Sequence, residues 1–161
     1  MAFIMKIYTD GGCRDNGQPG ARAAAACGFK TIWGKFWRPR TKVLPLNPTP
    51  TNQRAEITAI ILALEEALIK YEALHGNPYL KATIHSDSKY AIGCMTEWLP
   101  KWVRTGWITS LGDPVANQDL IQEASALHDQ LKGKGRVRYV WIPREKNEYA
   151  DRKCNDALDK L

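Results

Sequence analysis

Two aspartates follow short segments whose apolar residues predict β-strands. Asp10 comes directly after Phe3–Thr9, and Asp87 lies where the alternating run from Leu80 stops. Sites in open α/β sheets gather at the carboxyl edge of the strands, so neighbouring strands would place these carboxylates side by side. Two such carboxylates repel each other unless a cation lies between them. The alternative is that Asp10 serves the turn before Gly11-Gly12 and that Asp87 caps the following helix.

Two further acids come from segments that are predicted to be helical. Glu56 lies four residues before Ile60 and seven before Ala63, which places it on the apolar face of its helix. A carboxylate buried there is costly unless it is paired or bound to metal. The alternative is a first-turn acid favoured by the helix dipole. Asp151 lies beside Ala150 at the margin of an apolar helical stripe, where a solvated acid is the alternative.

One explanation covers all four acids. They come from four separated segments, and each is expected near a sheet edge or a buried helix face. Carboxylates, water and substrate phosphate are the usual ligands of Mg²⁺. Two such ions can clamp the attacking and leaving oxygens of a phosphodiester. A basic, tryptophan-rich protein with this cluster is predicted to be a nuclease.

The charge of the chain is uneven. The 161 residues have a formal net charge of +6. The first 54 contain nine Lys and Arg but only two Asp and Glu. This excess indicates a polyanion partner, although it agrees equally well with simple solubility. The length predicts one domain over residues 1–161, and no apolar run approaches the roughly 18 residues of a membrane span. We therefore expect a soluble, intracellular protein.

The order of the predicted elements indicates a mixed α/β sheet rather than a doubly wound one. The strands are predicted over Phe3–Thr9, Ala21–Phe29, Thr31–Lys42, Leu80 to the stop at Asp87, and Arg136–Ile142. The helices are predicted over Asn52–Leu74, Lys89–Met95, Asn117–Leu131 and Glu145–Leu161. The basic segment from Trp98 to Trp107 is not assigned to an element, and Asp10-Gly11-Gly12 is assigned to a turn.

Four segments occur in the order and with the spacing of a known family. They are Tyr8-Thr9-Asp10-Gly11, Thr51-Asn52-Gln53-Arg54-Ala55-Glu56, Ser86-Asp87-Ser88 and Asn147-Glu148-Tyr149-Ala150-Asp151-Arg152. Together with Trp98, Trp102 and Trp107, they resemble type 1 ribonuclease H over nearly the whole chain. The resemblance implies a ribonuclease H-like fold. Its five-stranded mixed sheet would have strands 1–3 antiparallel and strands 4 and 5 parallel to strand 1, flanked by helices.

The resemblance also implies an activity, a cofactor and a partner. The enzyme would be an endonuclease that hydrolyses the RNA strand of RNA–DNA hybrids and leaves 5′-phosphate and 3′-hydroxyl ends. Carried over by position, Asp10, Glu56, Asp87 and Asp151 would hold two Mg²⁺ ions, for which Mn²⁺ could substitute. Asp10 would bridge both ions, Glu56 and Asp87 would share one, and Asp151 would complete the other. The enzyme would act as a monomer and would bind double-stranded RNA only weakly.

Further residues are expected to bind the nucleic acid because they match family positions. On the RNA side, at the minor groove and the ribose 2′-hydroxyls, these are Gly12, Cys13, Asn16, Gln53 and Glu56. On the DNA strand they are Thr51, Asn52, Tyr90, Trp98 and Asn117. The 2′-hydroxyl is what distinguishes RNA from DNA. Lys101 and Arg104 correspond to a basic protrusion, in which Trp102 and Trp107 are interpreted as packing residues.

The chain departs from the family pattern at two points. Thr49 stands where some members have an arginine that grips phosphate, which predicts a weaker grip. The connection Trp141–Asn147 is too short for the glycine-histidine loop of many members and contains no histidine. Of the three histidines, only His85 lies near the expected site, two residues before Asp87. We interpret His85 as a structural residue of its strand.

Two other functions remain open at this point. Another two-metal nuclease of the same fold, such as a resolvase or an exonuclease, would lack the combination of Asn16, Thr51-Asn52-Gln53 and the tryptophans. A catalytically silent nucleic-acid-binding module would be expected to have lost at least one of the four acids.

Overall fold

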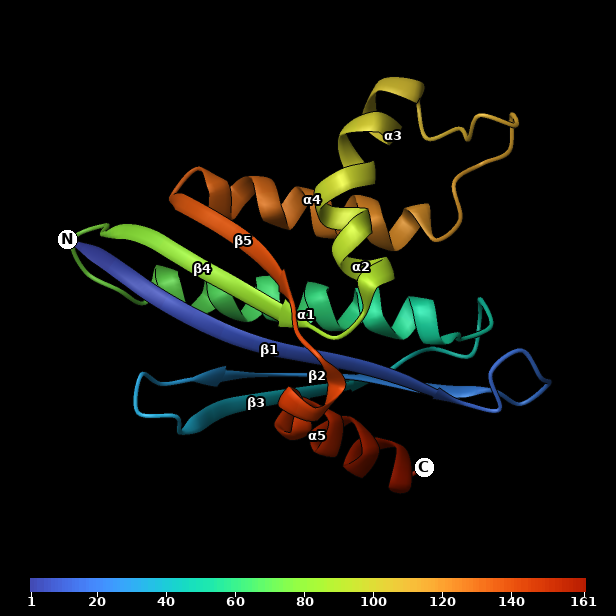
Figure 1. Ribbon diagram of the computed structural model, residues 1–161, viewed down its shortest axis with the longest axis horizontal. Helices are drawn as coiled ribbons and strands as arrows, with labels where there is room; N and C mark the ends of the chain where they lie inside the picture. The colour runs from blue at the N-terminus through green and yellow to red at the C-terminus, as the bar shows by residue number, and fades with distance from the viewer.

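The computed structural model describes residues 1–161 and contains a five-stranded sheet in the order β3-β2-β1-β4-β5 (Figure 1). The strands are β1 (Ala2–Arg14), β2 (Arg22–Lys30), β3 (Phe36–Val43), β4 (Tyr79–Ser86) and β5 (Gly135–Trp141). β2 pairs antiparallel with both β1 and β3, whereas β1 and β4, and β4 and β5, pair in parallel. The predicted mixed α/β sheet with a ribonuclease H-like topology is confirmed.

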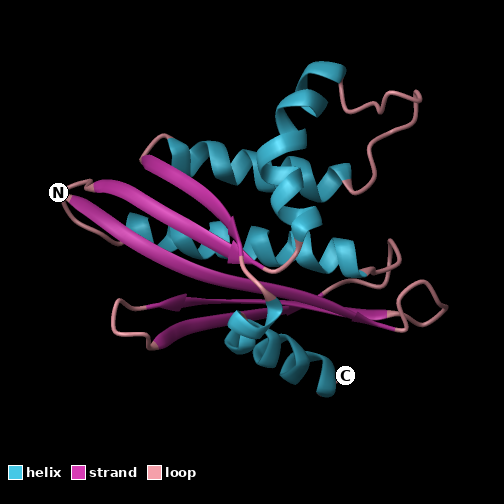
Figure 2. Ribbon diagram, in the orientation of Figure 1, coloured by secondary structure: helices cyan, strands magenta, loops and turns pink.

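Helices cover the two faces of this sheet unequally (Figure 2). They are α1 (Asn52–Glu72), α2 (Lys89–Gly93), α3 (Leu99–Thr105), α4 (Gln118–Lys132) and α5 (Glu148–Asp159). α1 and α4 pack together on one face. α5 lies on the other face, where it contacts β1, β2 and β3. The outer face of β4 and β5 is therefore left without a helix (Figure 1). None of the helices has the length and apolar character needed to span a membrane.

The main core lies between the sheet and the α1 layer. It includes Ile7 of β1, Ile60 of α1 and Ile84 of β4, all fully buried. β2 is buried on both faces because its side chains are mostly small. Ala24 and Ala26 of β2 pack with Cys154 and Leu158 of α5 in a second, smaller cluster. These alanines allow α5 to approach the sheet closely and bring its acids toward β1.

The turn predicted at Asp10-Gly11-Gly12 is wrong. β1 continues through these residues to Arg14, and Asp10 pairs with Ala26 of β2. The glycines serve packing instead of a turn. A Cβ on Gly11 would lie 2.3 Å from the backbone carbon of Ala55 in α1. The missing side chain therefore lets the start of α1 rest directly on β1.

The segment from Trp98 to Trp107, which was not assigned to an element, contains a helix. A π-helical turn over Cys94–Trp98 joins α2 to α3, so one nearly continuous helical arm leaves the sheet (Figure 1). The ring centroids of Trp98 and Trp102 lie 5.9 Å apart, which is the contact expected of residues four apart on a helix. Pro100 lies in the first turn of α3, where proline is tolerated.

Candidate active site

The four predicted carboxylates line one cavity of about 510 Å³. Asp10 projects from the middle of β1, Glu56 from the second turn of α1, Asp87 from the residue after β4, and Asp151 from the first turn of α5. The structure thus brings together side chains that are up to 141 residues apart in the chain. Arg14 and Arg144 are the only basic residues that line the same cavity, and Arg14 already pairs with Asp159 at 2.6 Å.

The convergence of four carboxylates on one cavity affects the protonation of Asp10. Asp10 is only 9% exposed. Its pKa is raised to about 8, first by burial and then by the charge of Asp87, a hydrogen bond with Asp151, and the charges of Asp151 and Glu56. The other three carboxylates therefore all oppose the ionisation of Asp10. Such mutual opposition is expected of a site that requires a cation.

The donor set fits a divalent metal ion. No group of three or more His, Cys, Asp or Glu side chains could hold an ion alone, so water or phosphate oxygens would have to complete the coordination. That is the usual mode of Mg²⁺, which retains several waters and uses one or two carboxylates with substrate phosphate. A cation among the four carboxylates would also offset the repulsion that raises the pKa of Asp10.

Ser88 fixes the side chain of Glu56. The Ser88 hydroxyl donates a hydrogen bond to Glu56 Oε2 at 2.5 Å and accepts one from the Ala91 N–H at 3.0 Å. Burial raises the pKa of Glu56, this hydrogen bond opposes the rise, and the charge of Asp87 adds to it. The cap of α2 is thus a serine, and not Asp87 as in the alternative considered from the sequence.

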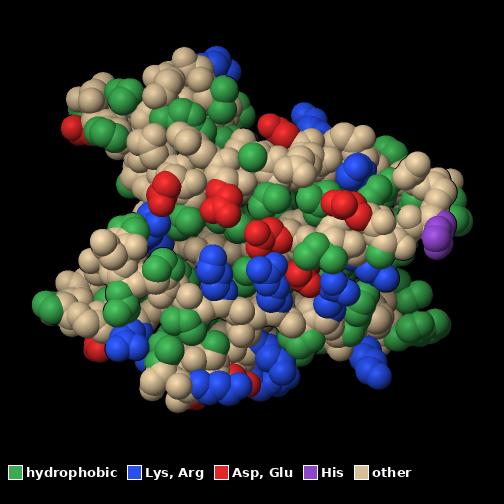
Figure 3. Space-filling view, turned by 180° about the vertical axis from the view of Figure 1, so that it is seen from behind, with side chains coloured by type: hydrophobic (Ala, Val, Ile, Leu, Met, Phe, Trp, Pro, Cys, Tyr) green, Lys and Arg blue, Asp and Glu red, His purple; other side chains and the backbone are tan.

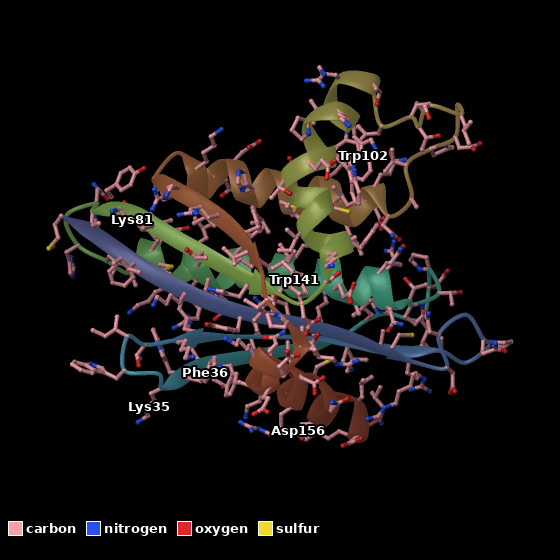
Figure 4. All side chains as sticks on the ribbon, viewed as in Figure 1. Lys35, Phe36, Lys81, Trp102, Trp141 and Asp156 are labelled. Atoms are coloured by element: carbon pink, nitrogen blue, oxygen red, sulfur yellow. The ribbon has the colours of Figure 1, made fainter.

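Asn147 holds Asp87 from the other side. Its Nδ2 donates to Asp87 Oδ2 at 3.0 Å and to the Thr9 carbonyl at 2.8 Å. The side chain is buried, and its Oδ1 accepts no hydrogen bond. Trp141 also positions Asp87, because its Nε1 donates a hydrogen bond to the backbone carbonyl of Asp87 at 3.0 Å. Figure 4 shows Trp141 at the end of β5, where it leads into the connection toward α5.

Sequence reasoning did not single out Ser88 or Asn147 as functional. Both lie inside segments that carried the family resemblance, but an uncharged serine or asparagine beside an aspartate has no distinctive sequence signal. An unsatisfied buried amide oxygen costs about 1–3 kcal/mol. The fold tolerates that cost at Asn147, whose Nδ2 joins Asp87 to the backbone of β1.

The residues expected to bind nucleic acid form two groups. The first lies at the start of α1, where Asn52 Oδ1 accepts from the Cys13 N–H at 2.8 Å and Asn16 Oδ1 accepts from the Asn52 N–H at 3.1 Å. Asn52, expected on the DNA side, therefore contacts the residues expected on the RNA side. Thr51 caps α1 by accepting from the Arg54 N–H at 3.1 Å, and Gly12 lines the carboxylate cavity.

The second group lines a larger cleft of about 840 Å³ between the start of α1 and the helical arm. Gln53, Tyr90, Trp98 and Lys101 line it. Asn117 joins them, since its Nδ2 donates to the Tyr90 hydroxyl at 2.9 Å and to Gln53 Oε1 at 3.3 Å. Gln53, expected on the RNA side, thus lies with residues expected on the DNA side. Arg104 is exposed on α3 and is not among the residues that line the cleft.

The connection between β5 and α5 is short and compact. A single 3₁₀ turn, Arg144–Lys146, fills it. His85 lies on β4, where its ring stacks on Tyr8 with 4.3 Å between centroids. Its Nδ1 lies 3.1 Å from the Ile7 carbonyl, which fits a neutral ring that donates from Nδ1. Burial, as the largest cause, lowers the pKa of His85. These contacts agree with a structural role.

The raised pKa of Asp10 predicts how stability depends on pH in the metal-free protein. Because that pKa exceeds the unfolded value of 3.8, the group destabilises the fold increasingly between about pH 4 and pH 8. Asp10→Asn should therefore be more stable than the wild type at about pH 8, by on the order of a few kcal/mol. The difference should shrink toward pH 4. Urea unfolding in chelator checks this, with exposed Asp156→Asn as the control, and a pH-independent difference would contradict it.

Comparison with known proteins finds one matching family model, together with similar sequences and similar structures. The family model for RNase H matches residues 3–160. A Ribonuclease H of Thiobacillus denitrificans is 35% identical over 161 residues, which covers 98% of this chain and 95% of the relative. RNase H1 from the halophilic archaeon Halobacterium salinarum NRC-1 has a similar structure, with a TM-score of 0.65, 25% identity and coverage of 99% and 100%. LC11-RNase H1 in complex with an RNA/DNA hybrid gives a TM-score of 0.66 at 25% identity, with 97% of both chains covered.

Proposed function

The chain belongs to the ribonuclease H family, and from this premise we propose that it hydrolyses the RNA strand of RNA–DNA hybrids with two divalent metal ions at the carboxylate cavity. The observation that carries the proposal is the convergence of Asp10, Glu56, Asp87 and Asp151 from four elements on one cavity. Mg²⁺ is the expected ion, and Mn²⁺ should substitute. When bound, the ions would supply an activated water and charge stabilisation at the phosphate.

The residues of the chain prepare this site in definite ways. Asp10, Glu56, Asp87 and Asp151 would hold the ions, and Asp10 interacts with each of the other three carboxylates. Ser88 and Asn147 hold Glu56 and Asp87 in fixed positions before substrate arrives. Such preorganisation matters because small displacements of catalytic groups cost large factors in rate. Attack of water on phosphorus with cleavage of the P–O3′ bond would leave a 5′-phosphate and a 3′-hydroxyl.

Hybrid binding would use the two groups of polar residues beside the cavity. The solved complex of LC11-RNase H1 with an RNA/DNA hybrid supports this mode. The group of Cys13, Asn16 and Asn52 is placed to reach the RNA strand and its 2′-hydroxyls. The cleft of Tyr90, Trp98 and Asn117 would take the DNA strand. The proposed site needs no residue from a second copy of the chain, in keeping with the expected monomer.

A comparison of substrates tests the proposed function. Cleavage of matched hybrid, double-stranded RNA and double-stranded DNA should be measured in Mg²⁺ and in chelator. We expect fast cleavage of the hybrid, at most weak cleavage of double-stranded RNA, and none of DNA. Cleavage of DNA would favour another nuclease of the same fold, and no cleavage of any substrate would favour a silent binding module.

Trp98→Ala should raise KM for the hybrid by about five- to tenfold and change kcat less, because it removes binding remote from the chemistry. Trp98 lines the cleft and also packs against Tyr90, with 6.3 Å between ring centroids. Trp98→Phe, which keeps an aromatic ring, is the control for folding. Steady-state kinetics with an unchanged KM would show that Trp98 is only a packing residue.

His85→Ala should lower kcat by less than about tenfold, well below the factor typical of a general acid or base. The ring is stacked on Tyr8 and bonded to the β1 backbone, which leaves it a structural role. Single-turnover cleavage between about pH 6 and pH 9 measures this. A loss beyond about a hundredfold in a folded variant would assign the missing loop histidine's task to His85.

A further inference from the structure

The face of the sheet opposite α1 is open over β4, β5 and the first half of β1. Side chains at alternate positions of these strands share this outer face. Parallel pairing sets them in rows across the sheet, with Lys81 between Ile4 and Arg136, Thr83 between Lys6 and Arg138, and His85 between Tyr8 and Val140. Figure 4 shows Lys81 on β4, in the part of the sheet beyond α5.

The charge on this open face has one sign. Its basic residues, called here the basic face, are Lys6, Lys30, Lys81, Arg136 and Arg138. None of them forms an ion pair. The outer positions of β1, β4 and β5 carry no acid before the carboxylate cavity is reached. The pKa of His85, lowered mainly by burial, is lowered further by the charges of Lys6 and Lys30.

Protection of a sheet edge and solubility, the two explanations that involve no ligand, account for only part of this charge pattern. Charged residues on an edge strand prevent edge-to-edge aggregation, which explains Arg136 and Arg138 of β5. It does not explain Lys6, Lys30 and Lys81, which lie on inner strands. A face kept charged for solubility alone would mix both signs. The opposite side of the molecule does so, since Glu65 and Glu66 pair there with Arg38 and Arg40 (Figure 3).

The aromatic rings on the basic face indicate contact with phosphates rather than bases. The rings of Tyr8 and His85 stack on each other with an interplanar angle of 6°. The Lys30 ammonium lies 5.2 Å from the Tyr8 ring centroid. The Tyr8 ring, which contacts both His85 and Lys30, is therefore not free to stack on a base, although such stacking is the way in which open sheets bind single-stranded RNA in many proteins. The remaining attraction is electrostatic and independent of sequence.

The geometry favours a single strand over a duplex. A hybrid that contacts both the carboxylate cavity and the cleft of Tyr90 and Trp98 lies toward α1 and the helical arm. Duplex nucleic acid is stiff, with a persistence length of about 150 base pairs for DNA, so it could not turn onto the outer face of β4 and β5. An unpaired continuation of the strand at the carboxylates could make that turn.

We propose that the basic face binds the phosphate backbone of a single-stranded extension of the RNA strand where it leaves the carboxylate cavity. The proposal rests on the proposed function, which places the RNA strand at that cavity. Lys81 lies six residues before Asp87, or about 20 Å along an extended strand. At the per-strand spacing of a duplex, about 3.4 Å per nucleotide, about six nucleotides cover that length, and a more extended strand covers it with fewer.

The test compares hybrids of about 12 base pairs that are blunt or carry single-stranded RNA tails of about one or ten nucleotides at either end. Binding is measured in excess chelator, where no cleavage occurs. The long tail at one end should tighten binding about tenfold at roughly 0.1 M salt, and the short tail should not. The double variant Lys81→Gln/Arg138→Gln should lose most of this gain in affinity. The slope of its log binding constant against log salt concentration should fall in magnitude by about 1.4, or about 0.7 for each lost phosphate contact.

The matched control is Lys42→Gln/Lys160→Gln, which removes two exposed charges, one on the opposite edge strand β3 and one just after α5, and should keep the full gain. An equal gain in both double variants would overturn the proposal. So would a gain from about ten extra base pairs of duplex that matches the gain from the tail, because a duplex would then be the occupant. Failure of the proposed function would appear separately, as absence of cleavage of the blunt hybrid by the wild type in Mg²⁺.

Discussion

Asp10→Asn is expected to reduce cleavage of the RNA strand by at least about 10³-fold, equivalent to about 4 kcal/mol of transition-state stabilisation. The substitution keeps the shape of the side chain but removes the negative charge among Glu56, Asp87 and Asp151. A neutral amide is a poor ligand for a hard divalent cation compared with a carboxylate. Hybrid binding should be retained, because phosphate contacts outside the cavity supply most of the affinity.

Single-turnover cleavage and binding of the same hybrid measure the two effects separately. The matched control is Asp156→Asn, the same chemical change at an exposed position of α5. It should leave the cleavage rate unchanged. Cleavage at a near-normal rate by Asp10→Asn would exclude a metal-binding role for this carboxylate.

Gly11→Ala should destabilise the fold by about 3 kcal/mol or more, the upper range for an overpacked site, and strongly reduce cleavage. The added Cβ would lie 2.3 Å from Ala55 C and 2.5 Å from the Glu56 backbone nitrogen. Backbone atoms cannot rotate away, so α1 must shift off β1. Because Asp10 and Glu56 lie directly beside this contact, the shift would also separate two of the four carboxylates.

Gly12→Ala is the matched control for stability. Its Cβ would meet only the side chains of Cys154 and Leu158, at 3.5 and 3.7 Å, which are ordinary contact distances. Urea unfolding of the two variants should therefore differ by about 2 kcal/mol or more. Equal stability of both would show that the close approach of α1 to β1 is not required by the fold.

Much of the architecture could be predicted from periodicity. The alternation of Leu80, Ala82 and Ile84 indicated a strand with one buried face, and the structure buries all three. The three- and four-residue spacing of Ile57, Ile60 and Ile61 indicated α1, since each faces the core. These signals are reliable because a strand or helix with one buried face needs apolar residues at the spacing at which its side chains return to that face.

Local signals failed where tertiary packing overrode them. Asp10-Gly11-Gly12 has the composition of a turn, yet pairing with the alanines of β2 extends β1 through it. The segment from Trp98 to Trp107 was not assigned to an element, although Pro100 fits the start of α3. At β1 the deciding contact comes from β2, another part of the chain, so no local rule could identify it.

The four carboxylates could be nominated from sequence, because two follow predicted strands, two lie on predicted helices at or beside an apolar face, and all four lie in the segments that resemble the family. The groups that hold them could not. Ser88 and Asn147 act through single hydrogen bonds across 32 and 60 residues of sequence. The contacts of Asn52 with Asn16 and of Gln53 with Asn117 could not be predicted from sequence either. They depend on where the start of α1 meets the neighbouring loops.

The most direct test of the metal-dependent mechanism is single-turnover cleavage of an end-labelled hybrid by the wild type as Mg²⁺ is increased from zero in chelator, with identification of the product ends. The account predicts no cleavage without Mg²⁺, a rate that rises with Mg²⁺ to a plateau, and products with 5′-phosphate and 3′-hydroxyl ends. Cleavage that continues in chelator, or products that end in a 2′,3′-cyclic phosphate, would contradict it.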